Sequence, residues 1–308
     1  MSTPTSALII GSTGQDGKLL TAQLAGKGYQ VTGIKRGDED LGSAEAVTRL
    51  LSRTAPSEFY YLAAYHHSSE QQYPSDLELF RSSYEVNVLY PLHFLDAIRA
   101  HWPKCRFFYA SSSLIFGDSP VEAQKEDSPY HPHSAYGITK LDGLLACRFY
   151  RENHGVFASA GILFNHESEY RQPSFLSKKI VAAVCDIAAG SVEKLVIGNT
   201  LAEVDWGYAP DYVDAMQRIL LAEKPGEFII ASGVKRQVSE FLDIAFSEKG
   251  LNWRDHVIEN QQQLKRERRT IVGDHSRLTQ ATGWFPKTSF RDMVQLLVKA
   301  EWTARGKT

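Results

Sequence analysis

Two side chains able to exchange protons, Tyr136 and Lys140, stand four positions apart in the chain. A spacing of four places both on one face of a helix. An ammonium group beside a phenol stabilises the phenolate, so the pair predicts a tyrosine that donates or accepts a proton near neutral pH. The same spacing is common on ordinary helix surfaces, and its interpretation therefore depends on the residues that precede it.

A serine triplet, residues 111–113, directly follows an apolar run over residues 106–110. Serines at strand ends mostly form turns. Upstream of a tyrosine and lysine pair, however, the hydroxyl of Ser112 is placed to hydrogen-bond a reacting oxygen and to share its proton with Tyr136. The sequence therefore predicts Ser112, Tyr136 and Lys140 as the catalytic group.

A glycine-rich turn, residues 11–17, lies between an apolar run over residues 7–10 and an amphipathic stretch over residues 18–28. The order strand, turn, helix is typical of dinucleotide sites. Gly11, Gly14 and Gly17 let the backbone approach a pyrophosphate, and the helix N-terminus supplies N–H donors and positive potential. We therefore expect a dinucleotide cofactor at this turn.

The second expected strand, residues 29–34, is followed by Lys35 and Arg36. An acidic residue at this place holds the ribose hydroxyls of NAD, whereas a basic residue suits the 2′-phosphate of NADP. Asp38 and Glu39 follow closely and weaken the distinction. The sequence predicts NADP, with NAD as the alternative.

Short apolar runs alternate with helical patterns through the first half of the chain. Further strands are expected over residues 59–64 and 106–110, and helices over residues 44–53 and 83–101. Such alternation predicts an α/β fold of Rossmann type, with a doubly wound parallel sheet.

The pattern changes after residue 164, where helical stretches (177–190, 210–223, 238–249 and 289–299) mix with short strands such as 195–197 and 227–230. We expect a dinucleotide-binding Rossmann domain over residues 1–164. Residues 165–308 should form mainly a smaller, mixed α/β substrate-binding cap, with segments near 204–232 returning to the first domain. The loop 118–132, rich in proline and charge, is expected to form a lip of the site.

Composition excludes several classes of protein. The 308 residues are 43% hydrophobic and 23% charged, and the formal net charge of −2 gives no reason to expect binding to nucleic acid or an anionic membrane. No apolar run approaches the roughly 20 residues that span a bilayer. Cys105, Cys147 and Cys185 are scattered in apolar surroundings, which predicts buried free thiols and a reducing, cytoplasmic location. No cluster of metal ligands stands out.

These motifs resemble those of the extended short-chain dehydrogenase/reductases, and most of all the GDP-mannose 4,6-dehydratases. Besides the glycine turn and the Tyr136/Lys140 pair, the resemblance rests on residues 62–64 (Leu-Ala-Ala), 161–168 (Gly-Ile-Leu-Phe-Asn-His-Glu-Ser), 205–207 (Asp-Trp-Gly) and 211–213 (Asp-Tyr-Val). Residues 161–168 are the most specific, and the resemblance covers nearly the whole chain. It implies a Rossmann domain, a tightly held nicotinamide and a nucleotide-sugar substrate.

The resemblance also implies which residues meet the two ligands. Cofactor contacts are implied for Gly11, Thr13, Gly14, Gln15, Asp16, Gly17, Lys35, Arg36, Asp40, Leu41, Ala63, Ala64, Tyr65 and Leu163. Substrate contacts are implied for Ser113, Leu114, Asn165 and, near the nucleotide, Lys179. The relatives pair through two helices that correspond to residues 83–101 and 135–154, which here carry apolar stripes. We therefore expect a homodimer, and the short loop after Arg36 disfavours a tetramer.

Departures from the family pattern bear on the reaction. In the dehydratases a glutamate two positions after the equivalent of Ser112 removes the proton from sugar C5. Here that position is Leu114, which cannot take a proton. Val204 stands where the family has an arginine that contacts the nucleotide diphosphate. A second family arginine has no single equivalent among Arg266, Arg268 and Arg269.

Keeping the triad while losing the dehydrating base predicts redox chemistry without elimination. The expected activity is an NADP-linked reduction of a 4-keto group on a GDP-linked hexose or 6-deoxyhexose. Three alternatives stay open: a dehydratase with a recruited base, a C4 oxidase or epimerase, and a catalytically silent nucleotide-sensing protein on the same fold. The complete triad opposes the last alternative, whereas the eroded nucleotide contacts favour it.

Several other residues near these motifs are open to two interpretations, a contact with a ligand or a structural role. His66 and His67 follow the strand that ends at Ala64, close to the expected nicotinamide, and either is a candidate substrate contact. For the rest, the simpler roles are solvent exposure for His131 and His133, hydrogen bonding for His166 and Glu167 (with a site contact as the alternative), and the core for Trp206.

Overall fold

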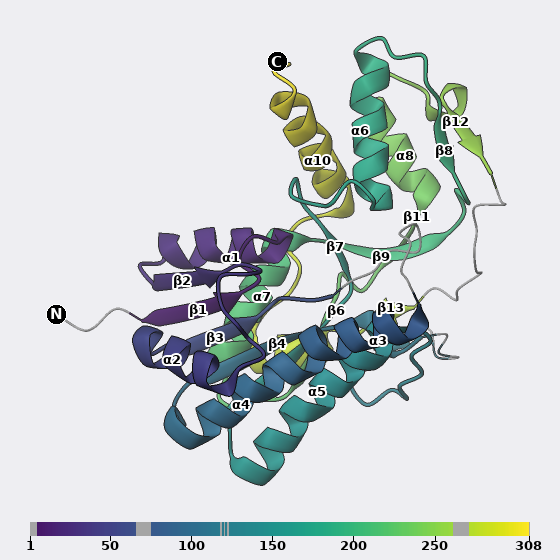
Figure 1. The fold of residues 1–308 in the computed structure, drawn as a ribbon. Helices are drawn as coiled ribbons and strands as arrows, with labels where there is room; N and C mark the ends of the chain where they lie inside the picture. Colours follow the sequence, from purple (N-terminus) through teal and green to yellow (C-terminus); the bar gives the residue numbers. More distant parts are fainter. Residues whose placement is uncertain are drawn as a thin grey trace.

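A parallel six-stranded sheet forms the centre of the protein in the computed structural model, which describes residues 5–65, 75–117, 119, 121, 123–260 and 271–307 (Figure 1). The strand order is β10-β6-β4-β3-β1-β2, and every neighbouring pair runs parallel. The strands are β1 (Ser6–Ile10), β2 (Gln30–Ile34), β3 (Glu58–Tyr61), β4 (Arg106–Ser112), β6 (Ala158–Leu163) and β10 (Glu227–Ile230). This sheet confirms the Rossmann-type fold predicted from the alternating pattern.

Helices cover both faces of the sheet, which explains why its strands are continuous apolar runs. One face carries α2 (Ala44–Thr54), α4 (Tyr90–His101) and α5 (Ala135–His154), and α3 (Asp76–Tyr84) packs against α5. The other carries α1 (Gln15–Gly26), α7 (Ala209–Leu221) and α9 (Ser276–Thr282). Figure 1 shows the two layers on opposite sides of the strands.

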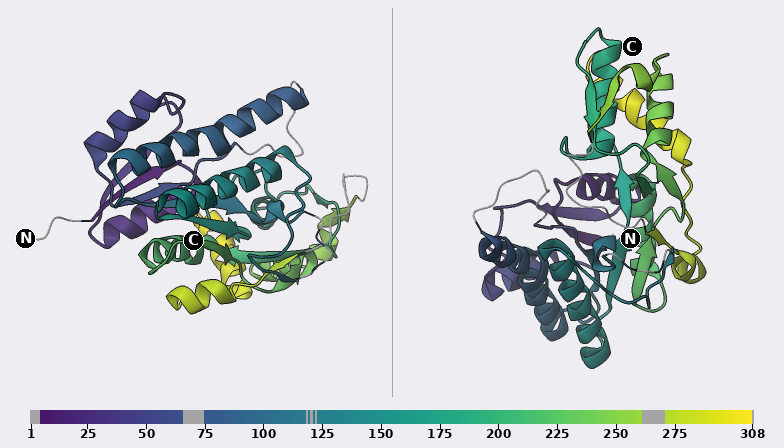
Figure 2. Two further views of the ribbon diagram at one scale, coloured as in Figure 1. Left: turned by 90° about the horizontal axis from the view of Figure 1, so that it is seen from below. Right: turned by 90° about the vertical axis from the view of Figure 1, so that its right-hand side faces the viewer.

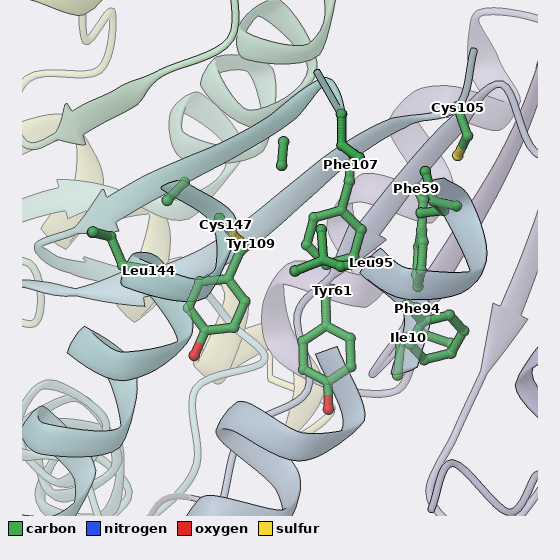
Figure 3. Close-up of a cluster of buried hydrophobic side chains, with 14 of the residues drawn as sticks. Ile10, Phe59, Tyr61, Phe94, Leu95, Cys105, Phe107, Tyr109, Leu144 and Cys147 are labelled. Carbon is green, nitrogen blue, oxygen red and sulfur yellow. The ribbon is translucent and has the colours of Figure 1, made fainter. Parts of the chain in front are cut away.

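The core beneath α4 and α5 is rich in aromatic rings (Figure 3). Phe59 meets the rings of Phe94 and Phe107 edge to face, with centroids 4.6 and 5.1 Å apart. Cys105 and Cys147 are buried in the same cluster, and Cys185 is buried in the cap. The prediction of buried free thiols is thus confirmed for all three.

Helix α5 lies very close to β4, and this contact determines where the first turns of the helix lie relative to the strand. Ser134 caps the helix by accepting a hydrogen bond from the N–H of Gly137 at 3.1 Å. A side chain at Gly143 would place its Cβ 2.2 Å from the hydroxyl of Tyr109 and 2.6 Å from the carbonyl oxygen of Asn87. Only glycine permits this approach. The first turns of α5 therefore reach the carboxyl end of β4.

The helix expected over residues 83–101 contains an irregularity that the sequence did not predict. Helices α3 and α4 are joined by a π-helical turn, Glu85–Leu89, so the helical path runs from Asp76 to His101. A π turn inserts one residue into the helical ladder and is frequent beside functional sites.

The second half of the chain builds a cap above the sheet, as the right-hand view of Figure 2 shows. Its helices α6 (Leu176–Ala188), α8 (Val238–Ser247) and α10 (Phe290–Ala304) enclose a third core that contains Trp206, which is therefore a core residue. Three small sheets complete the fold: β7 (Asn165–Glu167) with β9 (Glu203–Tyr208) and β11 (Lys235–Gln237), β8 (Leu195–Ile197) with β12 (Val257–Glu259), and β5 (Ala123–Gln124) with β13 (Val272–Gly273). Short 3₁₀ turns occupy Ser113–Ile115 and Trp253–Asp255.

The chain crosses back to the Rossmann layer at Ala209, because β9 pairs with β7 and β11 rather than with the central sheet. Helix α7 and strand β10 belong to the Rossmann layer, and α9 joins them later. The domain bounds expected from the sequence, with a returning segment near residues 204–232, stay a prediction. None of the described helices is both long and apolar enough to cross a membrane.

Candidate active site

A cleft of about 600 Å³ opens at the carboxyl ends of β1, β4 and β6. Its walls come from the glycine turn, the serine triplet, the first turns of α5 and the segment 163–175. All three predicted catalytic residues, Ser112, Tyr136 and Lys140, line it. Clefts at this edge of a parallel sheet are the usual ligand sites of such folds.

The glycine turn forms a cradle that side chains would fill. Gly11 has a φ of +90°, and a Cβ there would lie 2.7 Å from the backbone nitrogen of Ala63. A Cβ on Gly17 would lie 2.3 Å from the carbonyl oxygen of Gly11. The Lys18 N–H donates to the Gly14 carbonyl at 3.0 Å, so the N–H groups of the first helical residues, Gln15 to Gly17, have no acceptor within the helix. This geometry fits a pyrophosphate.

Asp16 is held by His166 rather than directed at a ligand. The Nε2 atom of His166 lies 3.0 and 3.1 Å from the two carboxylate oxygens of Asp16, and its Nδ1 lies 2.7 Å from the carbonyl oxygen of Phe164. Both ring nitrogens face acceptors, so both bonds are satisfied only by the doubly protonated imidazolium. The ring also stacks on Tyr212, with centroids 4.6 Å apart.

Asp16 and His166 each stabilise the charged form of the other. Burial alone would raise the pKa of Asp16, but the charge and hydrogen bond of His166 outweigh it and hold that pKa below its usual value. Burial alone would lower the pKa of His166, but Asp16 raises it overall. His166 thus takes the hydrogen-bonding role, one of its two expected roles. Glu167 does likewise, because its carboxylate accepts a hydrogen bond from Ser177 at 2.5 Å.

Gln15 ties the same turn to the cap. Its amide nitrogen donates to the carbonyl oxygen of His166 at 3.0 Å, and its amide oxygen accepts from the hydroxyl of Ser168 at 2.9 Å. The side chains of Gln15 and Asp16 therefore join the glycine turn to the strand β7 and the loop beyond it.

Lys140 is buried beneath the cleft and donates from its Nζ to the carbonyl oxygen of Ala110 at 2.8 Å. Its Nζ lies 5.6 Å from the ring centroid of Tyr136. Burial disfavours the ammonium form and lowers the pKa of Lys140 to about 7. The backbone carbonyl of Lys140 accepts a hydrogen bond from Ser111 at 3.1 Å, which fixes α5 against β4.

The prediction that Lys140 brings Tyr136 close to neutral pH is wrong for this geometry. Burial raises the pKa of Tyr136 to about 12. The Arg171 guanidinium opposes this shift, the Asp16 carboxylate adds to it, and a hydrogen bond from the Ser112 hydroxyl opposes it. Burial also disfavours the ammonium form of Lys140, which weakens its effect on Tyr136.

Asn87, in the π turn, is a supporting residue that sequence reasoning missed. Its amide nitrogen donates to Thr139 Oγ1 at 3.0 Å, and its amide oxygen accepts from the N–H of Tyr65 at 3.0 Å. Its carbonyl oxygen accepts from the Tyr109 hydroxyl at 2.8 Å. A buried asparagine in a helical stretch was the available signal, since asparagine has low helix propensity.

The predicted cofactor residues divide into two groups. Those that line the cleft are Gly11, Gly14, Gln15, Asp16, Gly17, Ala64 and Leu163. The others lie outside its lining: Thr13, Lys35, Arg36, Asp40, Leu41, Ala63 and Tyr65. Lys35 and Arg36 are exposed beyond β2, where the N–H of Lys35 donates to the Asp38 carboxylate at 3.0 Å. Their role toward a 2′-phosphate stays a prediction.

The predicted substrate residues also lie in two different places. Ser113, Leu114 and Asn165 line the cleft, whereas Lys179 lines a separate hollow between α6 and β8. Sequence reasoning missed Tyr170, Arg171 and Gln172, which also line the cleft.

Several expected residues lie away from the cleft or beyond the described structure. His131 and His133 are exposed, as predicted. His66, His67, Arg266, Arg268 and Arg269 lie outside the described residues. Within the described ranges, no group of three or more histidine, cysteine, aspartate or glutamate residues could hold a metal ion.

Comparison with known proteins shows the family to which the chain belongs. The model of the family described as GDP-mannose 4,6 dehydratase matches residues 37–297. The chain is 35% identical over 324 residues to GDP-mannose 4,6 dehydratase 1 of Arabidopsis thaliana, an alignment that covers 95% of this chain and 88% of the relative. The chain belongs to the GDP-mannose 4,6-dehydratase family. A member from Vibrio cholerae is 31% identical over 355 residues, covering 96% of this chain and 93% of the relative.

Solved structures of other proteins share the fold of this family member. RMD from Pseudomonas aeruginosa, solved with NADPH, superposes with a TM-score of 0.83 at 22% identity, covering 98% of this chain and 99% of that one. UDP-glucose 4-epimerase from Thermus thermophilus, solved with NAD, gives 0.81 at 20% identity, with 97% and 100% covered. The family and fold confirm the predicted enzyme class, a short-chain dehydrogenase/reductase.

Proposed function

We propose that this member of the dehydratase family is an NADP-linked oxidoreductase that reduces a 4-keto group on a GDP-linked hexose or 6-deoxyhexose. One observation carries the proposal. Among the described residues that line the cleft, Asp16 is the single carboxylate, and His166 holds it in an ion pair. Leu114 follows the serine triplet and also lines the cleft, at the position where the resemblance to the dehydratases implies a proton-abstracting glutamate.

The protein side chains supply the proton chemistry of a ketone reduction. Tyr136 lies in the cleft and would donate its phenolic proton to the sugar O4 as the carbonyl is reduced. Ser112, which hydrogen-bonds Tyr136, would orient that oxygen. Lys140 would hold the ribose of the cofactor. None of these three steps needs a carboxylate base.

The cofactor expectation is supported by the cradle at Gly11 and Gly17, which a Cβ would fill. A reduced nicotinamide bound there would supply the hydride. NADP is favoured over NAD by Lys35 and Arg36 at the end of β2. Structural relatives have been solved with either form, since RMD holds NADPH and the Thermus thermophilus epimerase holds NAD.

Assembly as a homodimer is supported by apolar side chains that α5 and the π turn present to solvent. Phe149 is 53% exposed and Leu145, one helical turn earlier, is 39% exposed. Leu89 adds a third apolar side chain at 49%. Burying such a surface against a second copy is favourable, and a two-fold axis would pair each patch with itself.

Family membership favours one competing function, a GDP-mannose 4,6-dehydratase with a base recruited from elsewhere. The curated relatives of 35 and 31% identity bear that name. An oxidase or epimerase acting at C4 would use the same triad. A silent nucleotide-sensing protein is disfavoured because Ser112, Tyr136 and Lys140 are all in place.

A reductase assay tests the proposal. The purified protein is given a GDP-linked 4-keto-6-deoxyhexose and NADPH, and nicotinamide absorbance is followed together with the sugar product. We expect one NADPH to be consumed per ketone and Tyr136→Phe to lose the activity. A protein that binds both ligands yet consumes no NADPH would favour the sensing alternative instead.

A further inference from the structure

An aromatic ring of the core lies beneath Lys140, outside the lining of the cleft. The Nζ atom of Lys140 lies 5.0 Å from the ring centroid of Tyr109 and 5.6 Å from that of Tyr136. Tyr109 belongs to β4 and is completely buried. An ammonium group over an aromatic face, within about 6 Å of the ring centroid, is attracted by the negative charge of that face. The Tyr109 ring is therefore placed to stabilise the charge of Lys140.

Contacts on several sides hold the Tyr109 ring in this place. Its hydroxyl donates to the carbonyl oxygen of Asn87 at 2.8 Å. The ring stacks on that of Tyr61, with centroids 6.2 Å apart and an interplanar angle of 17° (Figure 3). A side chain at Gly143, three positions after Lys140 on α5, would overlap the Tyr109 hydroxyl. The helix that carries Lys140 thus leaves room for the ring.

Neutral groups hold the Lys140 ammonium. Its Nζ donates to the carbonyl oxygen of Ala110 at 2.8 Å, and among the described residues it forms no ion pair with a carboxylate. The titratable and charged side chains around the rings of Tyr109 and Tyr136 are Tyr61, Tyr84, Asp142, Cys147, Asp16 and Arg171.

The charged members of this set have partners other than Lys140. Asp142 accepts a hydrogen bond from Tyr84 at 2.7 Å. Asp16 pairs with His166, and Arg171 lies 3.1 Å from a carboxylate oxygen of Glu167. A buried ammonium that lacks a carboxylate partner depends on carbonyl dipoles and ring faces for its stabilisation.

We propose that Tyr109 is a positioning residue whose ring holds Lys140 in its ammonium form at the carboxyl end of β4. The consequence for the reaction rests on the proposed function, because a charged Lys140 supports the proton transfer by Tyr136 better than a neutral one. Burial lowers the pKa of Lys140 to about 7, and attraction to the Tyr109 ring opposes this shift. Tyr109 acts through Lys140 and need not touch either ligand.

The test changes the charge on the ring face while keeping the size of the ring nearly constant. Tyr109→Phe is compared with replacement of Tyr109 by 4-fluorophenylalanine and by 3,4,5-trifluorophenylalanine. The pKa of Lys140 is followed by NMR of isotope-labelled lysine side chains, and Lys140→Met identifies the resonance by its absence. Fluorine withdraws electrons from the ring, so we expect this pKa to fall along the series. The trifluorinated variant should lie at least about half a unit below Tyr109→Phe.

Phe107 provides the matched control, because it lies two positions earlier on the same strand and in the same core cluster. The same fluorinated residues at Phe107 should leave the pKa of Lys140 unchanged, and circular dichroism confirms that each variant is folded. A pKa that stays constant or rises along the series at position 109 would overturn the proposal and leave Tyr109 a packing residue. The titration uses neither substrate nor turnover, so its failure is distinct from a failure of the proposed ketone reduction.

Discussion

The ion pair between Asp16 and His166 should make the stability of the protein depend on pH in a specific window. The substitution Asp16→Asn removes one charge and little volume. At 3.0 Å, two unit charges in a medium of effective dielectric about 20 attract by about 5 kcal/mol. Desolvation of the two largely buried groups offsets roughly half of this. We therefore expect Asp16→Asn to lower the free energy of unfolding by about 2–3 kcal/mol at about pH 5.5.

The sign of the pH dependence follows from the two shifts. The pKa of Asp16 is lowered, so its contribution is present above the unfolded value of about 3.9 and is lost as pH falls through the folded value. The pKa of His166 is raised, so its contribution is complete below about 6.5 and is lost as pH rises through the folded value. The difference between wild type and Asp16→Asn should be largest between these limits.

Urea unfolding at several pH values provides the assay. Above the raised pKa of His166 the neutral ring has one N–H for two acceptors, so the cost of Asp16→Asn should fall toward zero. Asp96→Asn is the matched control, because Asp96 forms an exposed ion pair with Arg99 that should contribute less than about 1 kcal/mol. An Asp16→Asn effect of the same size at all pH values would refute the imidazolium assignment.

Two further predictions concern the cofactor and the assembly. NADP should bind at least about ten-fold tighter than NAD, because a charge-assisted contact with the 2′-phosphate contributes about 1.5–3 kcal/mol. Arg36→Ala should reduce this difference in affinity. Equal affinities of the wild-type protein for NADP and NAD, measured by calorimetry, would exclude a contact of Arg36 with the 2′-phosphate. Light scattering should report a dimer at micromolar concentration. Phe149→Glu should convert the dimer to a monomer, whereas the control Val192→Glu, at a position in the cap that is 94% exposed, should leave it a dimer. A monomeric wild-type protein would contradict the expected assembly.

Much of the fold could be predicted from local pattern. The strands over residues 6–10 and 106–112 were recognisable because a sheet covered on both faces requires continuous apolar runs. The helix that carries Tyr136 was recognisable from the spacing of Tyr136 and Lys140, and the structure shows that Ser134 caps it. The asparagine at position 87 was a weak sign of an irregular helix, because its helix propensity is low, but the form of the π turn was not predictable, since it depends on packing between the turn, α5 and β4.

The grouping of the candidate catalytic residues was predictable, but their electrostatics were not. Ser112, Tyr136 and Lys140 were predicted by type and order, and in the structure they line one cleft. Asp16 and His166 are 150 positions apart, so only the folded chain reveals that they form an ion pair. The pKa of Tyr136 was misjudged for the same reason, because burial, which sequence spacing does not report, exceeds the effect of neighbouring charges.

Incubation with GDP-mannose alone distinguishes a reductase from a dehydratase. A dehydratase must abstract the C5 proton, and losing the positioned base commonly costs a factor of about 10²–10⁴ in rate. We expect little 4-keto-6-deoxy product without added reductant, and the variant Leu114→Glu should increase its formation. Rapid conversion of GDP-mannose by the wild-type protein, with no net use of nicotinamide, would contradict the reductase assignment and restore the dehydratase.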